Sequence, residues 1–549
     1  MSAGTETVIP QRYWAWGACI LATAACLALM PLSPYWVWPA VFFGFFALVG
    51  LWDFSQSRQA IRRNYPIIAH LRFFMEFIRP EIRQYFLEAD RDETPFSRAQ
   101  RSLVYQRAKG VMDKRPYGTQ LDPYEAGYEW INHSIAPIDI ASHDFRITIG
   151  EGRAKPYSAS VFNISAMSFG ALSANAVLAL NEGARRGGFY HDTGEGSISR
   201  WHRERGGDLV WEVGSGYFGC RDAEGRFDEK RFAENATSDQ VKMIEVKLSQ
   251  GAKPGHGGVL PGAKVTEEIS KARGVPIGVD CISPARHSSF STPAGLLEFV
   301  ARLRELSGGK PTGIKLAIGH PWEWFGIVKA MVETGITPDF VVVDGGEGGT
   351  GAAPLEFTDH VGAPLREALM LVHNSLVGTN LRGRVRVGAS ARIISAFDVA
   401  RTMAIGADWC NSARGFMFAL GCIQAQACHT GFCPTGVTTQ DPKRMRALHV
   451  PDKAERIHNF HENTLVALKE LLGAAGISHP SALGPEHIVR RVSSNEVRSL
   501  ATLHPWMKPG ELLASIPNHP VYQVFWAASR SDSFAAPHTV LTVPTSKSR

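Results

Sequence analysis

Three cysteines lie close together in the segment Gly421–Gln440, GCIQAQACHTGFCPTGVTTQ. Cys422, Cys428 and Cys433 form a C-x5-C-x4-C array, and Pro434 follows the last of them. Thiolates are soft ligands that suit iron–sulfur clusters and zinc. Three of them in a short segment rich in turn-forming residues predict a loop that wraps one inorganic centre.

The spacing of these cysteines does not decide which inorganic centre they would hold. Three thiolates suit a three-iron cluster, or a four-iron cluster whose fourth ligand is not a protein side chain. Zinc would take His429 as a fourth ligand, and three inert buried thiols are the remaining interpretation. Cys410 lies twelve residues upstream on a predicted buried strand, so we count three ligands.

Lysines and one glutamate stand at the ends of predicted strands. Lys247 ends one strand, Lys315 lies within another, and Lys253 belongs to the Gly- and Pro-rich stretch GAKPGHGGVLPG. A lysine in such a place holds an anionic flavin edge or a substrate carboxylate, or it forms an interior salt bridge. Glu195, in HDTGEG, is a candidate acid, base or orienting group, with a structural hydrogen bond as the alternative.

Glycine-rich loops follow three of the later strands. The first, DGGEGGTGAAP at Asp344–Pro354, places five glycines in seven positions: Gly345, Gly346, Gly348, Gly349 and Gly351. The others are Gly388-Ala389-Ser390 and Ser412-Ala413-Arg414-Gly415. Backbone amides in such loops can approach a ligand closely. A phosphorylated cofactor is therefore predicted, and flexible lids are the alternative use of glycine.

Short apolar segments alternate with amphipathic ones from about Ser158 onward. The candidate strands are Val161–Ala166, Gly188–Asp192, Ile244–Lys247, Pro276–Cys281, Thr312–Ala317, Phe340–Asp344, Arg384–Val387 and Trp409–Ser412. Candidate helices include Pro293–Leu306, Trp322–Glu333 and Ile394–Ile405. Eight strands alternating with helices predict an α/β fold, a (β/α)8 TIM barrel, and a doubly wound sheet is the alternative.

The N-terminal region carries a long uncharged run, Tyr13–Trp52, that is 40 residues long. Because a bilayer needs roughly 20 apolar residues per helix, and PLSP at Pro31–Pro34 interrupts the run, we expect a two-helix transmembrane hairpin with helices at about 13–31 and 35–52. Arginines follow at 58, 62, 63 and 72. The positive-inside rule then places the catalytic domain on the cytoplasmic face of the inner membrane.

These patterns divide the chain into four expected regions. Residues 1–57 form the hairpin, and 58–157 form a membrane-proximal region whose first part, Arg58–Arg107, is predicted helical. Residues 158–491 form the barrel with the loop 421–440, and 492–549 form a C-terminal extension.

Composition excludes several other classes of protein. The net charge is +6 over 549 residues, without a Lys/Arg block dense enough for nucleic acid. Eight cysteines are too few for a disulfide scaffold. We find no GxGxxG between a predicted strand and helix. If the cysteines and loops above hold redox cofactors, we expect the electrons to come from a partner such as ferredoxin, a reductase subunit or a membrane carrier.

Several long motifs together resemble the FMN-binding glutamate synthase family, and in particular its synthase domain. They occur in the family's order: SAMSFGALS at Ser165–Ser173, DTGEGS at Asp192–Ser197, AKPGHGGVLPG, DGGEGGTGA and CIQAQACHTGFCPTGVTTQ. The resemblance runs from about Ser158 to Asp441 and more loosely to Arg491. The N-terminal section is similar to short, membrane-associated members.

The resemblance implies FMN in the barrel mouth, a [3Fe–4S] cluster on the three cysteines, and reduction of 2-iminoglutarate, formed from 2-oxoglutarate and ammonia, to L-glutamate. It implies that Lys247, with Glu195, serves catalysis and that Lys247, Lys253 and Arg273 bind substrate carboxylates. The implied FMN contacts are Ser168, Lys315, Gly345, Gly346, Gly348, Gly349, Thr350, Gly388, Ala389, Ser390, Arg414 and Gly415.

The sequence also departs from the family. The expected glutaminase domain has no room before Ser158, so glutamine is not the expected amino donor unless a separate subunit releases ammonia. Val259 stands where a glutamine normally precedes LPG, and SISRWH follows DTGEG. Two alternatives follow: an enzyme for another 2-oxo acid or amine, similar to N-methylglutamate synthase, or an electron-transfer or redox subunit without amino acid turnover.

Overall fold

The computed structural model describes residues 10–91 and 94–537, so the first residues of the expected hairpin region and the end of the expected C-terminal extension lie outside it. The chain divides into two compact units, Met1–Arg98 and Ala99–Arg549. Each is described by itself.

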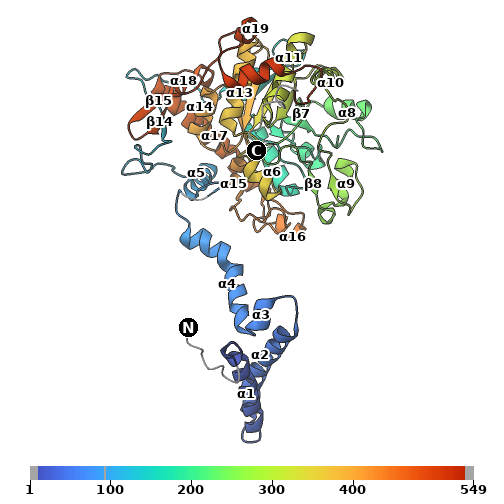
Figure 1. Cartoon of the computed structure of the whole chain (residues 1–549), viewed down its shortest axis with the longest axis vertical. Coiled ribbons are helices and arrows are strands. Elements are labelled where there is room, and N and C mark those ends of the chain that lie inside the picture. Colours follow the sequence, from blue (N-terminus) through green and yellow to red (C-terminus); the bar gives the residue numbers. More distant parts are fainter. Residues whose placement is uncertain (1–9, 92–93, 538–549) are drawn as a thin grey trace, which may run out of the picture. The chain divides into compact units, whose positions relative to one another are not determined.

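The N-terminal unit begins with two apolar helices, α1 (Trp14–Leu29) and α2 (Val37–Ser55), which lie side by side (Figure 1). Short 3-10 turns, η1 (Gln11–Tyr13) and η2 (Pro34–Trp36), precede them. The indole Nε1 of Trp16 donates to the carbonyl of Ala47 at 2.9 Å. A Cβ at Gly50 would lie 2.2 Å from the Trp16 ring, so this glycine permits the close packing.

Among the described residues, two stretches are long and apolar enough to cross a membrane: Gln11–Leu29, with 19 residues, and Pro34–Ser55, with 22. They correspond to the two helices predicted from the sequence, shifted by a few residues around the Pro31–Pro34 turn. The rest of the unit is also helical, with α3 (Ala60–Asn64), α4 (Ile68–Ile82) and the π-helical turn η3 (Arg83–Leu87). Helix α5 (Arg98–Lys109) begins at the boundary with the second unit.

In the described part of the second unit, eight parallel strands close into a barrel, which confirms the predicted (β/α)8 fold. In barrel order from the first, they are β4 (Phe162–Ile164), β5 (His191–Asp192), β6 (Leu209–Val213), β7 (Val241–Lys247), β10 (Thr312–Leu316), β11 (Phe340–Asp344), β12 (Arg386–Ser390) and β13 (Trp409–Ser412).

One predicted strand was wrong and one strand was missed. Pro276–Cys281 does not form a barrel strand, because Pro276 lacks an amide donor and Gly278 adopts a positive φ of 72°. The third strand is β6 instead, and Lys247 therefore ends the fourth strand. Cys281–Ile282 (β9) pairs antiparallel with Val259–Leu260 (β8) in a small separate sheet.

A hairpin closes the amino end of the barrel. It consists of β2 (Arg146–Ile149) and β3 (Tyr157–Ser160). Its buried Ile149, Tyr157 and Ala159 belong to one hydrophobic cluster. This cluster includes residues at the amino ends of barrel strands, such as Phe340 and Trp409. This end of the barrel is therefore filled with apolar side chains.

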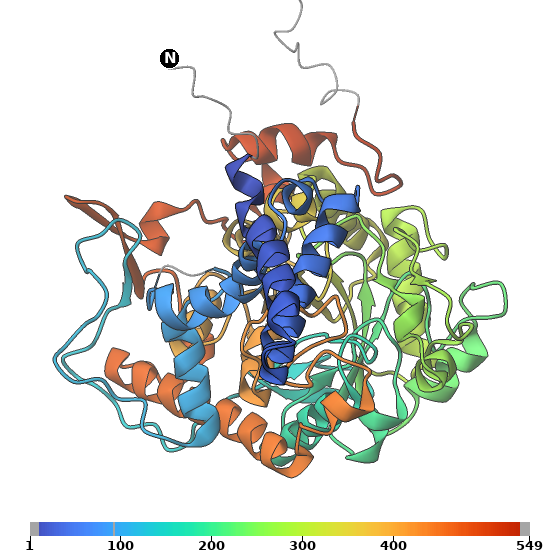
Figure 2. The same ribbon diagram turned by 90° about the horizontal axis from the view of Figure 1, so that it is seen from below.

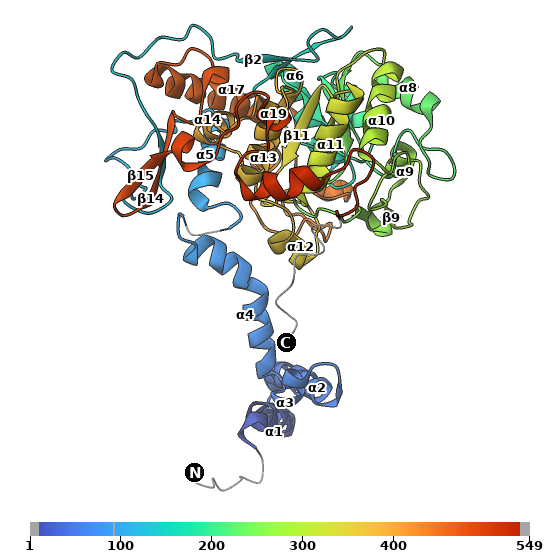
Figure 3. The same ribbon diagram turned by 45° about the horizontal axis from the view of Figure 1, so that its top comes forward.

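Helices surround the strands; Figure 3 shows α10, α11 and α13 outside the barrel beside β11. The longer ones are α6 (Ala174–Gly187), α8 (Glu229–Ala236), α10 (Pro293–Leu306), α11 (Pro321–Thr334), α13 (Leu365–Gly378), α14 (Ala396–Ala404) and α17 (Val450–Ala475). The shorter ones are α7 (Arg200–Glu204), α9 (Glu267–Arg273), α12 (Leu355–His360), α15 (Arg414–Leu420), α16 (Pro442–Met445), α18 (Leu500–Leu503) and α19 (Glu511–Ala514), with the turns η4 (Gly262–Lys264), η5 (Pro480–Ala482) and η6 (Tyr522–Trp526).

A three-stranded sheet lies at one edge of this unit. It joins β1 (Glu129–Ile131) to β14 (Ile488–Ser493) and β15 (Glu496–Ser499). Figure 2 shows the segment after α5 beside this red hairpin. This sheet thus joins a segment that precedes the barrel in the sequence to one that follows it.

Candidate active site

Charged side chains cluster inside the barrel at the carboxyl ends of β6, β7 and β10. Lys315 Nζ lies 2.9 Å from Glu212 Oε2 and 3.9 Å from Glu245 Oε1. Lys247 Nζ lies 2.7 Å from Glu195 Oε2 and 3.7 Å from Glu212 Oε1. Strand register explains the meeting, because Lys315 is paired with Lys247 and Glu212 with Glu245 across neighbouring strands. The two lysines are therefore linked through Glu212.

Three carboxylates in this network lie against one another. Asp192, Glu212 and Glu245 each offer an oxygen within 4.8 Å of the others, and all three are buried. Burial and the neighbouring Glu212 raise the pKa of Asp192 to about 7, although Lys315 opposes the rise. Burial and Asp192 also raise the pKa of Glu245 well above its ordinary value. The group therefore holds protons near neutral pH.

Glu195 lies among three cations. Burial raises the pKa of its carboxyl, but Lys247, Arg273 and Lys253 outweigh burial and lower it. Lys253 is 7% exposed and Arg273 is 4% exposed. Burial lowers the pKa of Lys253, against the field of Glu195. The four predicted residues are thus brought together, and their three positive charges exceed the single negative charge of Glu195.

Arg273 is held firmly although it lies in the last turn of a short helix. Its Nη2 donates to the carbonyl of Phe169 at 3.0 Å, and its Nη1 lies 3.6 Å from Cys281 Sγ. Its guanidinium stacks over the ring of Phe218 at 5.3 Å. The Nε has no hydrogen-bond partner among the described residues, which leaves a buried donor for a ligand.

The loop after β4 packs against the loop after β5. A Cβ at Gly194 would lie 2.6 Å from the Ser168 amide nitrogen, and one at Gly196 would lie 3.0 Å from Arg273 Nη2. These glycines therefore allow the predicted contact Ser168, the Glu195 loop and Arg273 to approach one another. Two motifs quoted above, SAMSFGALS and DTGEGS, meet at this wall of the site.

The glycine-rich loop after β11 has two kinds of glycine. A Cβ at Gly345 would lie 2.6 Å from Leu365 Cβ, and one at Gly346 would lie 2.8 Å from the Gly362 carbonyl oxygen, so both serve loop packing. Gly349 and Gly351 have no atom within 3.3 Å of such a Cβ. Their backbone is less crowded than that of Gly345 and Gly346, which leaves room for a ligand to approach it.

Arg414, the first residue of α15, holds this loop. Its Nη2 donates to the carbonyl of Thr350 at 2.8 Å, and its Nη1 lies 3.4 Å from Met417 Sδ. A Cβ at Gly349 would lie 3.4 Å from Arg414 Nε. The predicted cofactor contacts Thr350, Gly349 and Arg414 are therefore in one place. At Gly415 a Cβ would lie 2.6 Å from Ser412 Oγ, so this glycine serves packing.

The loop predicted after the seventh strand begins later than expected. Gly388, Ala389 and Ser390 are the last residues of β12, not a loop. A Cβ at Gly388 would lie 2.5 Å from the Trp409 ring, and Ala389 is fully buried. Only Ser390 presents a polar group, with its Oγ 3.0 Å from Ser165 Oγ. The strand therefore extends to Ser390, and the lack of a side chain at Gly388 leaves room for the Trp409 ring.

The three cysteines of the array line one pocket. Its wall contains Cys422, Cys428 and Cys433 together with Met417, Ile423, Ala425, Gln426, Ala427, Pro434, Thr435, Val437 and Thr438. All three thiols are free. Gln424 and Gln426 adopt positive φ angles of 59° and 55°, which turn the chain around the pocket. Cys410 and His429 do not line this pocket, so its donor set is three thiols and fits an iron–sulfur centre better than zinc.

Hydrogen bonds tune two of these sulfurs. The Gln424 amide donates to Cys422 Sγ at 3.5 Å, and Cys433 Sγ lies 3.5 Å from Thr435 Oγ1. Burial raises the pKa of the Cys433 thiol, but hydrogen bonds from Thr435 and Thr438 outweigh burial and lower it to about 7. A thiol with this pKa readily becomes the thiolate, which is the form that binds metals.

The pocket adjoins the glycine-rich loop and other elements. A Cβ at Gly351 would lie 3.9 Å from Cys428 Cβ. Lys264 Nζ donates to the Cys428 carbonyl at 3.0 Å. The hydroxyl of Tyr105, on α5, donates to the Cys422 carbonyl at 2.6 Å. The thiols are therefore next to the loop that borders the barrel mouth.

Sequence reasoning missed the acidic part of the network. Asp192, Glu212 and Glu245 were not predicted as site residues, and β6 itself was missed. The available signal was a single glutamate inside each of two apolar runs, LVWEV and VKMIEVK. A charge at such a position has to face the barrel interior and must find a partner there.

Val259, where the resemblance predicts glutamine, is 43% exposed and pairs with Ile282 across the β8–β9 sheet. The adjacent Gly258 is close to the site instead: a Cβ there would lie 2.2 Å from Glu195 Oε1. The departure at Val259 therefore lies beside the site, one residue from a glycine that contacts it.

Comparison with known proteins agrees with this geometry. The sequence model described as "Conserved region in glutamate synthase" matches residues 127–478. The glutamate synthase large subunit-like protein YerD of Bacillus subtilis (strain 168) is 36% identical over 500 residues, which cover 83% of this chain and 95% of that protein. The archaeal-type glutamate synthase (NADPH) of Thermotoga neapolitana is 36% identical over 334 residues, 60% of this chain and 62% of that protein. The archaeal glutamate synthase (NADPH) of Methanocaldococcus jannaschii is 37% identical over 335 residues, with coverages of 61% and 62%. The chain thus spans less than two thirds of the latter two relatives.

Proposed function

Because the chain belongs to the family defined by the conserved region in glutamate synthase, and is thus an oxidoreductase of the glutamate synthase type, we propose that it reductively aminates 2-oxoglutarate, through 2-iminoglutarate, to L-glutamate. We include FMN and a [3Fe–4S] cluster as its cofactors. The expected organisation into hairpin, membrane-proximal region, barrel and C-terminal extension is part of the same proposal.

The observation that carries the proposal is the cluster of Lys247, Lys253 and Arg273 around Glu195. A dicarboxylate with a reacting carbonyl between its ends needs more than one cationic partner. Arg273 supplies a planar fork with a buried Nε that has no partner among the described residues. Lys253 and Lys247 supply point charges, and the excess positive charge favours a dianionic substrate.

FMN fits the barrel mouth. It would be held by Ser168, Lys315, the backbone of Gly349 and Gly351, Thr350, Ser390 and Arg414. When bound, FMN supplies the hydride for the imine carbon. Lys315 stays positively charged there, because neighbouring carboxylates, with Glu212 and Asp344 first among them, outweigh burial and raise its pKa well above its ordinary value.

Cys422, Cys428 and Cys433 would hold the cluster, which supplies electrons one at a time. Arg414 contacts the glycine-rich loop and Met417 of the thiol pocket, so it keeps the two sites adjacent.

Side chains of the protein itself would bind the substrate carboxylates and supply protons. Lys247 and Arg273 orient the substrate carboxylates, and Glu195 fixes the Lys247 ammonium by a 2.7 Å ion pair. The carboxyl of Asp192, with a pKa of about 7, holds a proton close to Lys315 and is the candidate source of protons for the product.

We extend the proposal to the cell membrane. The stretches Gln11–Leu29 and Pro34–Ser55 would cross the inner membrane as a hairpin, with the barrel in the cytoplasm. Electrons would come from a partner such as ferredoxin or a reductase subunit, and ammonia would be the amino donor.

The test is anaerobic purification of the full chain in detergent, followed by an absorbance spectrum, assays for flavin, iron and sulfide, and calorimetric titration with 2-oxoglutarate. Bound FMN, about three irons per chain and binding of 2-oxoglutarate but not of the monocarboxylate pyruvate are expected. Flavin without iron would overturn the cluster. Flavin and iron without binding of 2-oxoglutarate would overturn the substrate.

A second candidate is an enzyme for another 2-oxo acid, and the position of Val259 favours it. Because Gly258 contacts Glu195 and the glutamine is absent next to it, this edge of the substrate has one polar contact fewer than the resemblance predicts. Titration of a series of 2-oxo dicarboxylates of increasing length distinguishes the two candidates. Tighter binding of another member of the series than of 2-oxoglutarate would favour the second.

A further inference from the structure

Helix α4 of the N-terminal unit has an apolar face bordered by arginines. We propose that α4 and the η3 turn lie in the cytoplasmic surface of the membrane and bind the phosphates of anionic lipids. This inference rests on the proposed crossing of the membrane by α1 and α2, and it concerns a different surface from the substrate site.

The apolar face is continuous over more than four turns. At 3.6 residues per turn, one arc of about 120° collects Ile68, Leu71, Phe74, Met75, Ile78, Ile82 and Tyr85. Leu71 is 64% exposed and Phe74 is 55% exposed in the N-terminal unit. Phe77 lies outside this arc. An exposed apolar stripe of this length is typical of a helix that rests in an interface.

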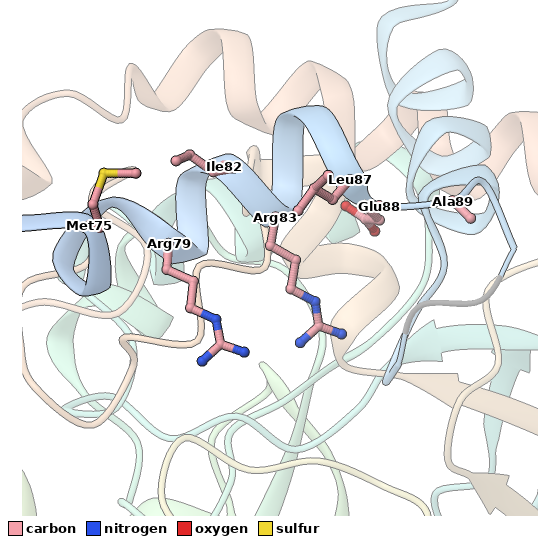
Figure 4. A pocket seen from close by; sticks show the side chains of 7 residues that line it. All are labelled: Met75, Arg79, Ile82, Arg83, Leu87, Glu88 and Ala89. Atoms are coloured by element: carbon pink, nitrogen blue, oxygen red, sulfur yellow. The ribbon is translucent and has the colours of Figure 1, made fainter. Parts of the chain in front are cut away.

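Arginines border one edge of this face. Arg72, Arg79 and Arg83 follow one another along the helix, and Arg72 pairs with Glu76 at 3.0 Å. Figure 4 shows Arg79 and Arg83 side by side, pointing to one side of α4, while Met75 and Ile82 point to the other. The two arginines line one pocket together with Met75, Ile82, Leu87, Glu88 and Ala89. This arrangement offers guanidinium groups beside an apolar strip, as a lipid phosphate above acyl chains requires.

The connection to α2 fixes where α4 begins. Asp53, near the end of the second apolar stretch, is fully buried, and its carboxylate lies 2.9 Å from His70 Nε2. The same carboxylate accepts from the Ile67 amide at 3.0 Å, and Ile67 turns the chain with a φ of 68°. The first turn of α4 is therefore bound to the end of α2. If α2 spans the membrane, α4 starts at its surface.

The net positive charge of residues 58–83 indicates which kind of membrane surface α4 would bind. Between positions 58 and 83 the sequence contains six arginines and two glutamates, without lysine or aspartate. Basic residues immediately beyond a membrane span attract anionic headgroups. Arg62 also stacks on Phe73 at 4.8 Å, which keeps α3 against α4 within the same basic segment. An anionic bilayer surface is thus the occupant that both the apolar face and its border favour.

The test is hydrogen–deuterium exchange of the full chain in nanodiscs of phosphatidylcholine, with and without phosphatidylglycerol. Peptides covering residues 68–87 should exchange about tenfold more slowly with phosphatidylglycerol present, because several arginines gain phosphate partners. The double substitution Arg79→Glu, Arg83→Glu should abolish this difference between lipids. Leu71→Ser with Phe74→Ser should speed exchange in both lipids.

The matched control is Lys230→Glu with Lys508→Glu, which changes the net charge equally on exposed residues of the barrel unit. It should leave exchange at 68–87 unchanged. Protection of 68–87 that is equal in both lipids and unaffected by Arg79→Glu, Arg83→Glu would overturn the proposal and indicate a protein surface instead. Peptides of α1 and α2 report separately on the premise, since rapid exchange there would show that the hairpin does not cross the membrane.

Discussion

The barrel holds its charges on strands, whereas the thiol pocket holds its sulfurs on a loop. Lys247, Lys315, Glu212 and Glu245 belong to β6, β7 and β10, and the register of those strands fixes their separations. Cys422, Cys428 and Cys433 follow α15 in a segment shaped by left-handed turns. In the first region Lys247 and Lys315 form ion pairs with Glu195 and Glu212 inside the protein. In the second region the three thiols share one cavity, and neutral hydrogen-bonding groups contact two of them.

This difference predicts two kinds of mutational effect. Removing a strand-borne charge leaves a buried partner uncompensated, so folding itself should suffer. Removing a loop-borne thiol removes a ligand but leaves packing nearly intact. We therefore expect the strand-borne network to support the fold as well as the proposed substrate site, and the thiol loop to matter for the proposed cluster alone.

The largest effect is expected at Lys315. The substitution Lys315→Met leaves Glu212 buried without its 2.9 Å partner, and should lower the free energy of unfolding by about 3–5 kcal/mol. Urea titration of the full chain in detergent measures this, with the exposed Lys230→Met as control. A loss no greater than that of the control would remove the distinction between the two regions.

The next largest effect is expected at Arg273, which is on α9 rather than on a strand. Arg273→Ala removes charge-assisted hydrogen bonds worth about 1.5–3 kcal/mol, so kcat/KM for the oxo acid should fall roughly 10- to 100-fold. The exposed Arg226→Ala serves as the control in the same steady-state assay. Unchanged turnover of every oxo acid tested would show that the cation cluster does not bind substrate.

The pH dependence of stability sharpens the comparison further. Burial and Glu212 raise the pKa of Asp192 to about 7 in the folded chain, above its ordinary value near 4, so folding favours the protonated form. The contribution is full at low pH and is lost as pH rises through 7, with a slope of at most about 1.4 kcal/mol per pH unit. Asp192→Asn should remove this slope. The measurement is the free energy of unfolding of the unmodified chain minus that of the variant across pH 4–8, which should fall as pH rises. If this difference instead rose with pH, the raised pKa would be contradicted.

The smallest effect on folding is expected in the thiol loop. Cys433→Ser should change the free energy of unfolding of the iron-free chain by no more than about 1 kcal/mol, because the exchange is nearly isosteric. Iron per chain should nevertheless fall to background. Cys410→Ser is the control and should retain iron, because Cys410 lies on β13, interacts with Thr402 and does not line the thiol pocket. Iron retained in Cys433→Ser would place the centre elsewhere.

The sequence predicted that the three cysteines lie together. It also identified the two lysines of the strand-borne network, but not the two glutamates. The cysteine array is local, so its spacing in sequence translates directly into one pocket. Lys247 and Lys315 were found because each is a lysine at or near the end of an apolar strand. Glu212 and Glu245 were missed because their partners are set by strand register, which a single sequence does not display.

Arg273 shows another limit. Nothing in the local pattern EEISKAR distinguishes it from a surface arginine, and only the resemblance to a family singled it out. Its burial depends on Phe169 and Phe218, which lie in two separate loops, and on Cys281 of β9. The false strand Pro276–Cys281 arose from Ile277 and Val279, which are apolar but exposed.

The hairpin β2–β3 has a consequence for kinetics. Because it fills the amino end of the barrel with Ile149, Tyr157 and Ala159, the site has its opening at the carboxyl end. Oxo acid and amino acid product would then share one entrance and the same cations. The product is therefore expected to inhibit competitively against the oxo acid, and release of one molecule must precede entry of the next.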